Sequence, residues 1–182
     1  MIANLTAFKD HDTLLAAWPE VVRHFGSNAP MLLLAGSLSD KPTAARLKNK
    51  AFDLGLSSEQ VKFLGVVKDV PSLVAETDLV VHSSLREGCP NAVCEAMALS
   101  RAVVATDISG CRQALGDDAD CLVEPSNPQA LASAIIRLLE NDELRKAKGE
   151  QNRERIATHF TLEGMNEFFQ EQIERGLGRA LC

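Results

Sequence analysis

The chain has 182 residues, 46% of them hydrophobic, which is enough for one globular domain with a substantial core. Its net charge of −6 and its few aromatic residues argue against a broad nucleic-acid surface and a base-stacking platform. No apolar run approaches the roughly 20 residues of a membrane span, and no secretory signal precedes the first apolar segment. The odd number of cysteines, without CxxC pairs, favours a reduced, intracellular protein.

Short apolar runs alternate with amphipathic stretches along the first 124 residues. The predicted strands are mostly continuous apolar segments, typical of strands buried on both faces, at 2–6, 31–36, 61–65, 79–84, 102–106 and 121–124. The predicted helices and helical turns lie between them, at 12–25, 43–54, 70–76, 90–99 and 111–115. Three further helices are expected at 128–139, 142–158 and about 162–176.

This alternation predicts an α/β fold with a doubly wound, parallel, Rossmann-like sheet of about six strands and helices on both faces. We expect a single domain over residues 1–182, with a core of about 1–158 and additional helices at the C-terminal end. Ligands of such sheets bind beyond the carboxyl ends of the strands, so the loops that follow the strands are the first places to look for a site.

The loop after the fourth predicted strand carries the most chemistry, with the sequence LREGCPNAVCEAMALS. Pro90 fits the first position of a helix, which places Cys89 at the N-cap. Because cysteine is a poor cap, we expect the amides of Asn91 and Ala92 to remain free for an anion at the positive end of the helix. Gly88 would allow a ligand to approach the backbone closely.

Two acidic residues flank this helix start. The predicted helix is apolar almost all round, so Glu95 needs a partner, which is either a structural donor or a ligand. Glu87 on its own could simply favour the helix N-terminus through the helix dipole. The spacing of Glu87 and Glu95, with Gly88 and Pro90 between them, favours a ligand site.

The segment EGCPNAVCEAMALSRAVVAT, residues 87–106, resembles the donor-binding signature EGxPxxxxEAMAxGxPVVAT of retaining glycosyltransferases of the GT-B fold, in the large group 1 (family four) class. The stretches VKFLGVVKDVPSLVAETDLVVHSS and LVEPSNPQALASAIIRLLEN, on either side of it, are similar to those of the class as well. The resemblance runs from residue 2 to about residue 155. It implies that the chain is the C-terminal donor-binding domain of such an enzyme and that the N-terminal acceptor domain is absent.

The resemblance also implies the roles of individual residues. Glu95 would accept hydrogen bonds from the ribose of a nucleotide sugar, and Glu87 would lie beside the donor sugar. The amides of residues 88–92 would hold the diphosphate, and Val66 would border the base. The donor-binding set is then Asn4, Lys9, Val66, Glu87, Gly88, Cys89, Pro90, Asn91, Ala92 and Glu95, with Glu87 and Lys9 also catalytic.

A second motif of the class, GRLxxxKG, matches residues 3–10 in part. Lys9 is kept, but Asn4 replaces the arginine that neutralises the diphosphate, and Asp10 replaces the final glycine. Asn4 can donate only neutral hydrogen bonds, which are weaker than those of a cation. A third motif, TDxGGxxE, keeps only one of its two glycines, at Gly110, which puts donor-sugar contacts there in doubt.

The expected reaction is transfer of a sugar from a nucleotide diphosphate sugar to a hydroxyl acceptor, with retention and without a metal or other cofactor. Catalysis would be mainly electrostatic, through Lys9, the helix N-terminus and Glu87. The resemblance implies polysaccharide, glycolipid or lipopolysaccharide synthesis in the cytoplasm, with peripheral association of the full-length enzyme at the inner face of the membrane. We expect this chain alone to bind its donor weakly and to transfer nothing.

Two other functions remain open from the sequence: a nucleotide-sugar epimerase of the same architecture, and a non-catalytic nucleotide-sugar-binding module. A dehydrogenase is disfavoured, because no GxGxxG follows the first predicted strand. Among the histidines, His82 is expected in the core, and His11 is a candidate for ligand contact because it lies close to Lys9.

Overall fold

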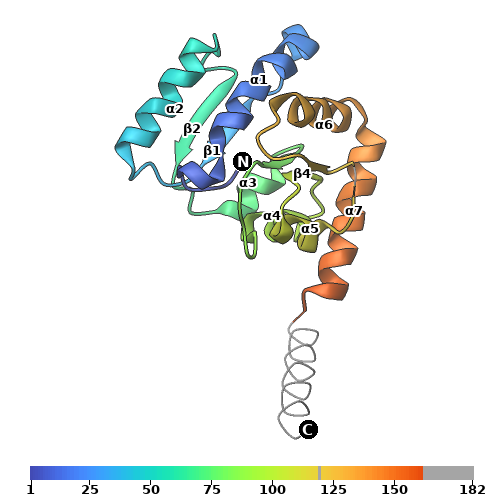
Figure 1. Ribbon diagram of the computed structural model, residues 1–182. Helices are drawn as coiled ribbons and strands as arrows, with labels where there is room; N and C mark the ends of the chain where they lie inside the picture. The colour runs from blue at the N-terminus through green and yellow to red at the C-terminus, as the bar shows by residue number, and fades with distance from the viewer. Residues whose placement is uncertain (119, 162–182) are drawn as a thin grey trace, which may run out of the picture.

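The computed structural model describes residues 1–118 and 120–161, and in this part strands and helices alternate as predicted (Figure 1). The strands are β1 (Leu32–Ala35), β2 (Val61–Gly65), β3 (Val80–His82), β4 (Val103–Thr106) and β5 (Leu122–Val123). The helices are α1 (His11–Phe25), α2 (Lys41–Asp53), α3 (Val70–Ala75), α4 (Asn91–Ala98), α5 (Ser109–Leu115), α6 (Pro128–Glu140) and α7 (Asp142–His159), with 3₁₀ turns η1 (Ala7–Lys9) and η2 (Gly26–Asn28). The helix expected at 162–176 lies outside the described residues.

All the strand pairings are parallel. β1 pairs with β2, and β3, β4 and β5 pair in that order. The N-terminal segment runs along β1: Ile2 forms a bridge with Ala35, and the Ala3 amide donates to the Ala35 carbonyl at 2.8 Å. The predicted strand at 2–6 is therefore only an isolated bridge, and the described residues contain five strands where about six were expected. The backbone of this N-terminal segment forms hydrogen bonds with β1 and the loop that follows it. On the side of β3, the contact is made by side chains, from the Ser83 hydroxyl to the Met1 sulfur.

The pairings in the described residues give two parallel sheets, β1–β2 and β3–β4–β5, where a single sheet was expected; helices cover both faces, as predicted. α1 packs against α6 and α2, while α4 packs against α3, α5 and the strands β3 and β4 (Figure 1). Several helices begin at an Asp or Asn whose side chain accepts a hydrogen bond from a backbone amide. Asp40 caps α2 through the Thr43 amide at 3.2 Å, which is why α2 starts at Lys41, two residues before the predicted start.

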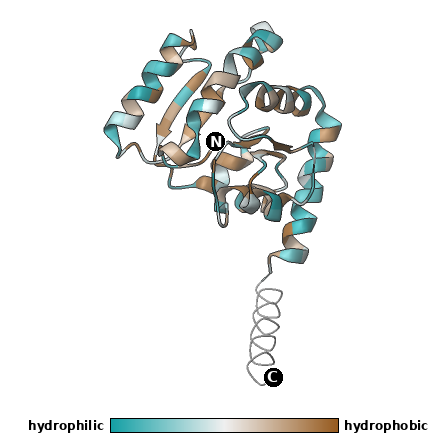
Figure 2. Cartoon of the chain, viewed as in Figure 1, coloured by the Kyte–Doolittle hydropathy of each residue, from teal (hydrophilic) through white to brown (hydrophobic). Residues whose placement is uncertain are grey.

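The core lies around the central strands. Every residue of β3 and β4 is buried, as their apolar sequences predict. β2 is different, because its exposure alternates and Lys62 and Leu64 reach the surface. α2 and α7, at opposite sides of the view, are largely hydrophilic in Figure 2. Backbone hydrogen bonds between the segments after β1 and β3 and the N-terminal segment place the carboxyl ends of these strands next to η1, where the predicted site residues lie.

Candidate functional site

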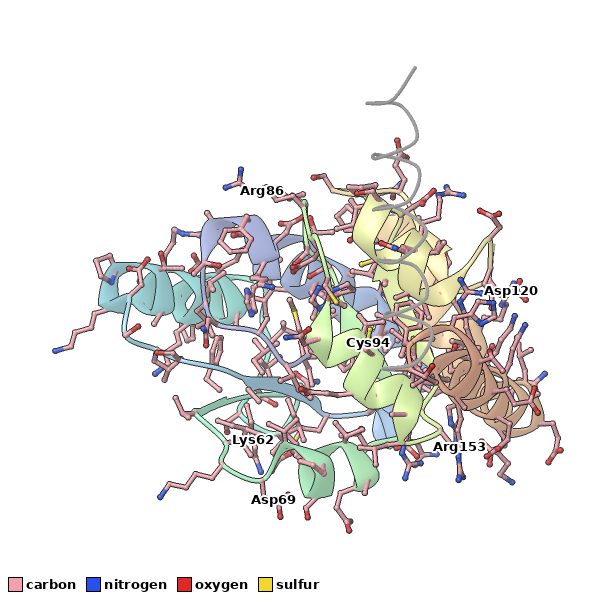
Figure 3. The ribbon with its side chains drawn as sticks, turned by 90° about the horizontal axis from the view of Figure 1, so that it is seen from below. Lys62, Asp69, Arg86, Cys94, Asp120 and Arg153 are labelled. Atoms are coloured by element: carbon pink, nitrogen blue, oxygen red, sulfur yellow. The ribbon has the colours of Figure 1, made fainter. Side chains whose placement is uncertain are left out.

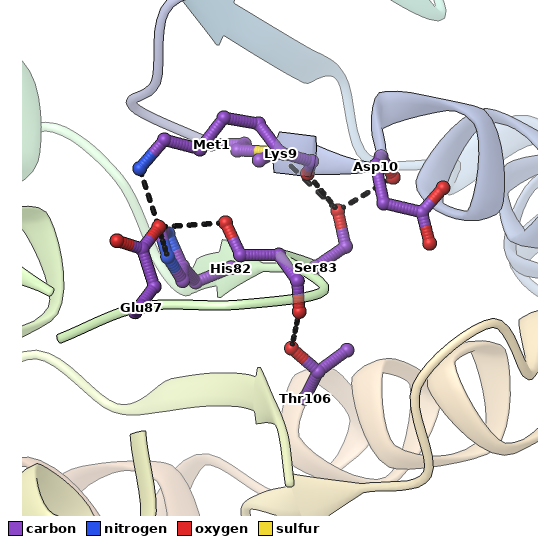
Figure 4. Close-up of polar contacts among 8 residues, drawn as sticks. Met1, Lys9, Asp10, His82, Ser83, Glu87 and Thr106 are labelled. Carbon is purple, nitrogen blue, oxygen red and sulfur yellow. Dashed lines mark hydrogen bonds and ion pairs between the residues drawn. The ribbon is translucent and has the colours of Figure 1, made fainter. Parts of the chain in front are cut away.

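The loop after β3 is tied to the segment that begins α1. The Ser83 hydroxyl donates to the Asp10 carbonyl at 2.9 Å and to the Lys9 carbonyl at 3.3 Å (Figure 4). The Leu85 amide donates to the Phe8 carbonyl at 2.8 Å. Two loops far apart in sequence are therefore joined through their backbones, and this brings Lys9 next to the loop that carries Glu87.

Glu87 is the centre of a compact polar cluster. Its Oε1 atom accepts a hydrogen bond from the Lys9 ammonium and another from the Ser84 hydroxyl at 2.7 Å, and it lies 3.0 Å from Nε2 of His82 (Figure 4). The Glu87 side chain is only 11% exposed. Burial by itself would raise the pKa of Glu87, but the hydrogen bonds from Lys9 and Ser84 lower it overall. Glu87 is therefore a fixed carboxylate that is negatively charged at neutral pH.

His82, which the sequence analysis placed in the core, is also part of the cluster around Glu87. It is buried, 2% exposed, as expected for a residue of β3, but its ring points to Glu87. Burial lowers the pKa of His82, while the charge of Glu87 acts in the opposite direction. The imidazole is thus neutral near pH 7, and since an ionised carboxylate only accepts, Nε2 carries the proton. The sequence did offer a signal for this contact: a histidine is the last residue of an otherwise apolar strand, just before the site loop.

Asp10 occupies the position of the motif's final glycine, and the structure explains how an aspartate can stand there. Its φ is +48°, in the left-handed region that glycine adopts most easily and Asp or Asn tolerates. Its side chain accepts a hydrogen bond from the Thr13 amide at 3.2 Å and so caps α1. The replacement of glycine therefore keeps the turn that presents Lys9.

Asn4 and Val66 line one small cavity at the same edge of the sheet. The cavity has a volume of about 180 Å³, and Gly36, Ser37 and Val70 also line it. Oδ1 of Asn4 accepts a hydrogen bond from the Ser37 amide at 2.9 Å, so this side chain fastens the loop after β1. Val66 is 74% exposed. The structure thus brings together two residues predicted to bind different parts of the donor.

The start of α4 differs from the prediction. Pro90 is the N-cap, without a side-chain cap, and the helix begins at Asn91, so Cys89 lies one residue before the cap. The Asn91 amide, expected to be free, donates to the Cys89 carbonyl at 3.1 Å because the chain turns tightly there. Gly88 is exposed, and a Cβ at this position would meet no atom within 4 Å, which leaves the loop open to a ligand.

Glu95 is exposed on α4, so the expectation of a helix buried almost all round is wrong. α4 buries Val93, Ala96 and Met97 and leaves a polar face on the outside. Within the described part of the chain, no hydrogen bond or ion pair occupies the Glu95 carboxylate, and none joins it to Glu87. A structural donor for Glu95 is therefore not found there.

Two more residues shape the site loop. A Cβ at Gly110 would lie 2.5 Å from the carbonyl oxygen of Glu87 and 3.0 Å from that of Gly88, so only glycine lets α5 pack this closely. Arg86 lies at the outer edge of the loop (Figure 3), and its guanidinium carbon is 5.5 Å from the centre of the Phe8 ring. The ammonium of Lys9 lies 5.4 Å from the same ring, so the rim holds a second cation, which the sequence reasoning did not single out.

His11, in contrast, is not a surface residue. It is 2% exposed, and within the described residues neither ring nitrogen has a hydrogen-bond partner. Burial lowers the pKa of His11 to about 4. The structure therefore provides no route for His11 to contact a ligand directly.

A parallel α/β fold thus carries a cation, a carboxylate and an open helix start at the carboxyl ends of its strands, where ligands of such folds bind. The family model of glycosyl transferases group 1 matches residues 1–141, and the chain belongs to this family.

Curated relatives agree with this assignment. The chain is 33% identical over 137 residues to N,N'-diacetylbacillosaminyl-diphospho-undecaprenol alpha-1,3-N-acetylgalactosaminyltransferase of Campylobacter jejuni, a match that covers 71% of the chain and 35% of that enzyme. It is 32% identical over 147 residues to phosphatidyl-myo-inositol mannosyltransferase of Mycolicibacterium smegmatis, with 79% of the chain and 36% of that enzyme covered. The chain thus spans little more than a third of the length of these relatives.

Solved structures show the same fold. Anabaena HepE, in a complex with UDP and glucose, superposes with a TM-score of 0.83 at 24% identity, over 96% of this chain and 47% of that one. S. aureus TarM, in a complex that contains UDP, gives a TM-score of 0.81 at 27% identity, over 93% of this chain and 34% of that one. The fold of this chain therefore corresponds to part of larger enzymes.

Proposed function

We propose that this chain is the donor-binding domain of a retaining glycosyltransferase and that it binds a nucleotide diphosphate sugar at the carboxyl edge of the sheet. The observation that carries the proposal is the cluster in which Lys9, His82 and Ser84 converge on one oxygen of Glu87. A buried, ionised carboxylate beside a lysine and an open helix start provides a charge for the sugar and positive groups for the diphosphate.

Each part of the donor has a place in this arrangement. The diphosphate would lie over the loop of residues 88–92, where Gly88 is open and the amide of Ala92 lies in the first turn of α4, at the positive end of the helix dipole. Lys9 would neutralise the diphosphate as it leaves, so that no metal ion is required. The base would lie against Val66 in the cavity that Asn4 lines, and Glu95 would accept hydrogen bonds from the ribose.

Catalysis follows from these positions. As the bond from the anomeric carbon to the diphosphate breaks, positive charge develops on the sugar and negative charge on the leaving group. Glu87 would stabilise the first, and Lys9, once it turns from Glu87 to the diphosphate, the second. The hydroxyl acceptor would be bound by an N-terminal acceptor domain, and the sugar would be transferred with retention.

The cellular role is proposed from the same resemblance. The Campylobacter relative is named for an acceptor linked to diphospho-undecaprenol, and the Mycolicibacterium relative for phosphatidyl-myo-inositol. We infer that the parent enzyme of this chain works on polysaccharide, glycolipid or lipopolysaccharide precursors at the inner face of the membrane. Within the described residues, no helix has the length and apolar character to cross a membrane, which is compatible with peripheral association.

A calorimetric screen with UDP-, GDP- and ADP-sugars tests the proposal. We expect one of the three nucleotides to bind weakly, and Glu95→Ala to reduce its affinity about tenfold through the loss of ribose hydrogen bonds to a charged group. Glu154→Ala, which removes another exposed helical glutamate, serves as the matched control and should leave the affinity unchanged.

Other outcomes would favour other functions. Absence of binding by all three nucleotides, in the wild type as in the Glu95→Ala variant, would overturn donor binding and support a non-catalytic interaction module. Binding followed by epimerisation of the sugar by the full-length parent would support the epimerase. Sugar transfer by the purified chain alone would contradict the requirement for a separate acceptor domain.

A further inference from the structure

The cluster around Glu87 contains one group that can move and one that cannot. Lys9 has a flexible four-carbon stem and its side chain is 19% exposed, so its ammonium can turn towards solvent. His82 belongs to β3 and is 2% exposed, which fixes its ring. Both groups contact the same Oε1 atom of Glu87.

A bound diphosphate would compete with Glu87 for Lys9. The proposed function assigns Lys9 to the diphosphate, yet without a ligand its ammonium is paired with Glu87. Two anions that share one cation repel each other, and the repulsion is strong where water is largely excluded. Glu87, with a side chain 11% exposed, then needs another group to keep it charged and in place.

We propose that His82 is a positioning residue that holds Glu87 through its Nε2–H group when Lys9 turns from Glu87 to the diphosphate of the donor. The inference rests on the proposed function for the identity of the ligand, and on the distances around Glu87 for the roles of the side chains. The Ser84 hydroxyl, 2.7 Å from Oε1 of Glu87, assists as a neutral donor. His82 differs from it because it can also take up a proton.

The charged surroundings of His82 indicate when it would take up that proton. Burial lowers its pKa; Glu87 raises it, and Lys9 lowers it further. The Met1 amino group would also lower it when charged, but burial lowers the pKa of that group to about 5, so it is largely neutral near pH 7. His11 in α1 also interacts with His82 but is itself neutral, because burial lowers its pKa to about 4. When Lys9 moves away, a lowering influence is lost and Glu87 remains, so the pKa of His82 rises. Diphosphate binding should therefore be accompanied by proton uptake at His82.

The first test needs no ligand. In the wild type, the imidazole ¹⁵N spectrum should show His82 as the neutral Nε2–H tautomer at pH 7. Lys9→Met imitates the departure of the ammonium, and we expect it to raise the pKa of His82 in an NMR titration. His24, exposed and paired with Glu140 at the far end of α1, is the internal control, and its NMR signals should be the same in both proteins. If Lys9→Met does not fold, Lys9→Gln gives the same comparison.

The second test adds UDP, GDP and ADP separately to the wild-type chain. Any of the three that binds should raise the pKa of His82, and its binding enthalpy should vary with the ionisation enthalpy of the buffer. His82→Leu should abolish this proton uptake, whereas His82→Gln should keep the N–H donor to Glu87 and restore the affinity for the corresponding nucleotide sugar. The loss in His82→Leu is expected to be about tenfold for the nucleotide sugar.

The two tests separate the two proposals. An unchanged pKa of His82 in Lys9→Met, or an Nδ1–H tautomer in the wild type, would overturn the positioning role even if a nucleotide binds. Failure of all three nucleotides to bind would contradict the proposed function, and the Lys9→Met titration would still decide the role of His82.

Discussion

Glu87 and Glu95 are eight residues apart, yet their side chains have opposite surroundings. Glu87 lies in the loop after β3, nearly buried, with three groups around one carboxylate oxygen. Glu95 lies on the exposed face of α4, and within the described residues its side chain has no partner. One carboxylate is therefore fixed by its neighbours in the absence of a ligand, and the other is exposed to solvent; under the proposed function the first would stabilise charge and the second would accept hydrogen bonds from the ribose.

Removal of the two carboxylates should have very different effects on stability. Glu87→Ala leaves Lys9, His82 and Ser84 without their common acceptor, and we expect a loss of about 2–3 kcal/mol in the free energy of unfolding. Glu95→Ala should change it by less than about 0.5 kcal/mol, because an exposed side chain without a partner is removed. Urea denaturation measures both values. Equal losses would show that the cluster around Glu87 does not stabilise the fold.

Gly110→Ala should disturb the Glu87 region alone. The new methyl group would lie 2.5 Å from the carbonyl oxygen of Glu87, so the loop or α5 must move, at a cost of about 1–2 kcal/mol. Gly88→Ala is the matched control, because its methyl group would meet open space. Thermal unfolding compares the two variants, and a Gly88→Ala variant that is the less stable one would contradict this packing.

The acid limb of the stability curve should also depend on Glu87. Because its pKa is lowered in the folded state, Glu87 stabilises the fold at a pH above the ordinary glutamate pKa of about 4.3, and this contribution is lost as the pH falls through the folded-state pKa. The difference in unfolding free energy between the wild type and Glu87→Gln should therefore shrink on acidification. A difference that stays constant from pH 7 to pH 2 would exclude a charged Glu87 as its source.

Asn4→Arg should have the smallest effect on the stability of these variants, and it tests the ligand contacts of the site through nucleoside diphosphate affinity. It restores the cation of the GRLxxxKG motif, whose longer side chain would extend from the cavity that Asn4 lines towards the proposed diphosphate, and we expect roughly a threefold to tenfold gain in nucleoside diphosphate affinity. The gain should fall at higher salt concentration, since it is electrostatic. Because Oδ1 of Asn4 also accepts a hydrogen bond from the Ser37 amide, the folding of the Asn4→Arg variant should be checked by circular dichroism. A weaker affinity in a folded variant would place the diphosphate away from position 4.

The fold was largely accessible from the sequence because buried parallel strands and capped helices leave local signals. The apolar runs of β3 and β4 predict strands close to those observed, and the helix predicted at 128–139 corresponds to α6. Asp40 was not recognised as a cap, so the start of α2 was predicted two residues late. The first predicted strand, at 2–6, was overestimated, because an apolar segment does not reveal how many neighbours its backbone will bond.

For the candidate site, the sequence predicted the residue types better than the contacts between them. The motif placed Lys9 and Glu87 in one site, and the structure pairs them. That His82 reaches Glu87 depends on the turn between β3 and the loop, which the sequence does not specify. The start of α4 was misplaced by one residue, because Pro90 is acceptable both as the N-cap and as the first helical residue.

An NMR map of nucleotide binding tests most directly whether the donor binds at the carboxyl edge of the sheet. The backbone amide spectrum of the chain would be followed while UDP, GDP and ADP are added separately. We expect one of them to shift the amides of Lys9, Val66, Gly88, Cys89, Asn91 and Ala92 together, at the carboxyl edge of the sheet. Shifts confined to the apolar cavity at the opposite end of the strands, lined by Met31 and Leu73, or no shifts at millimolar concentration, would contradict it.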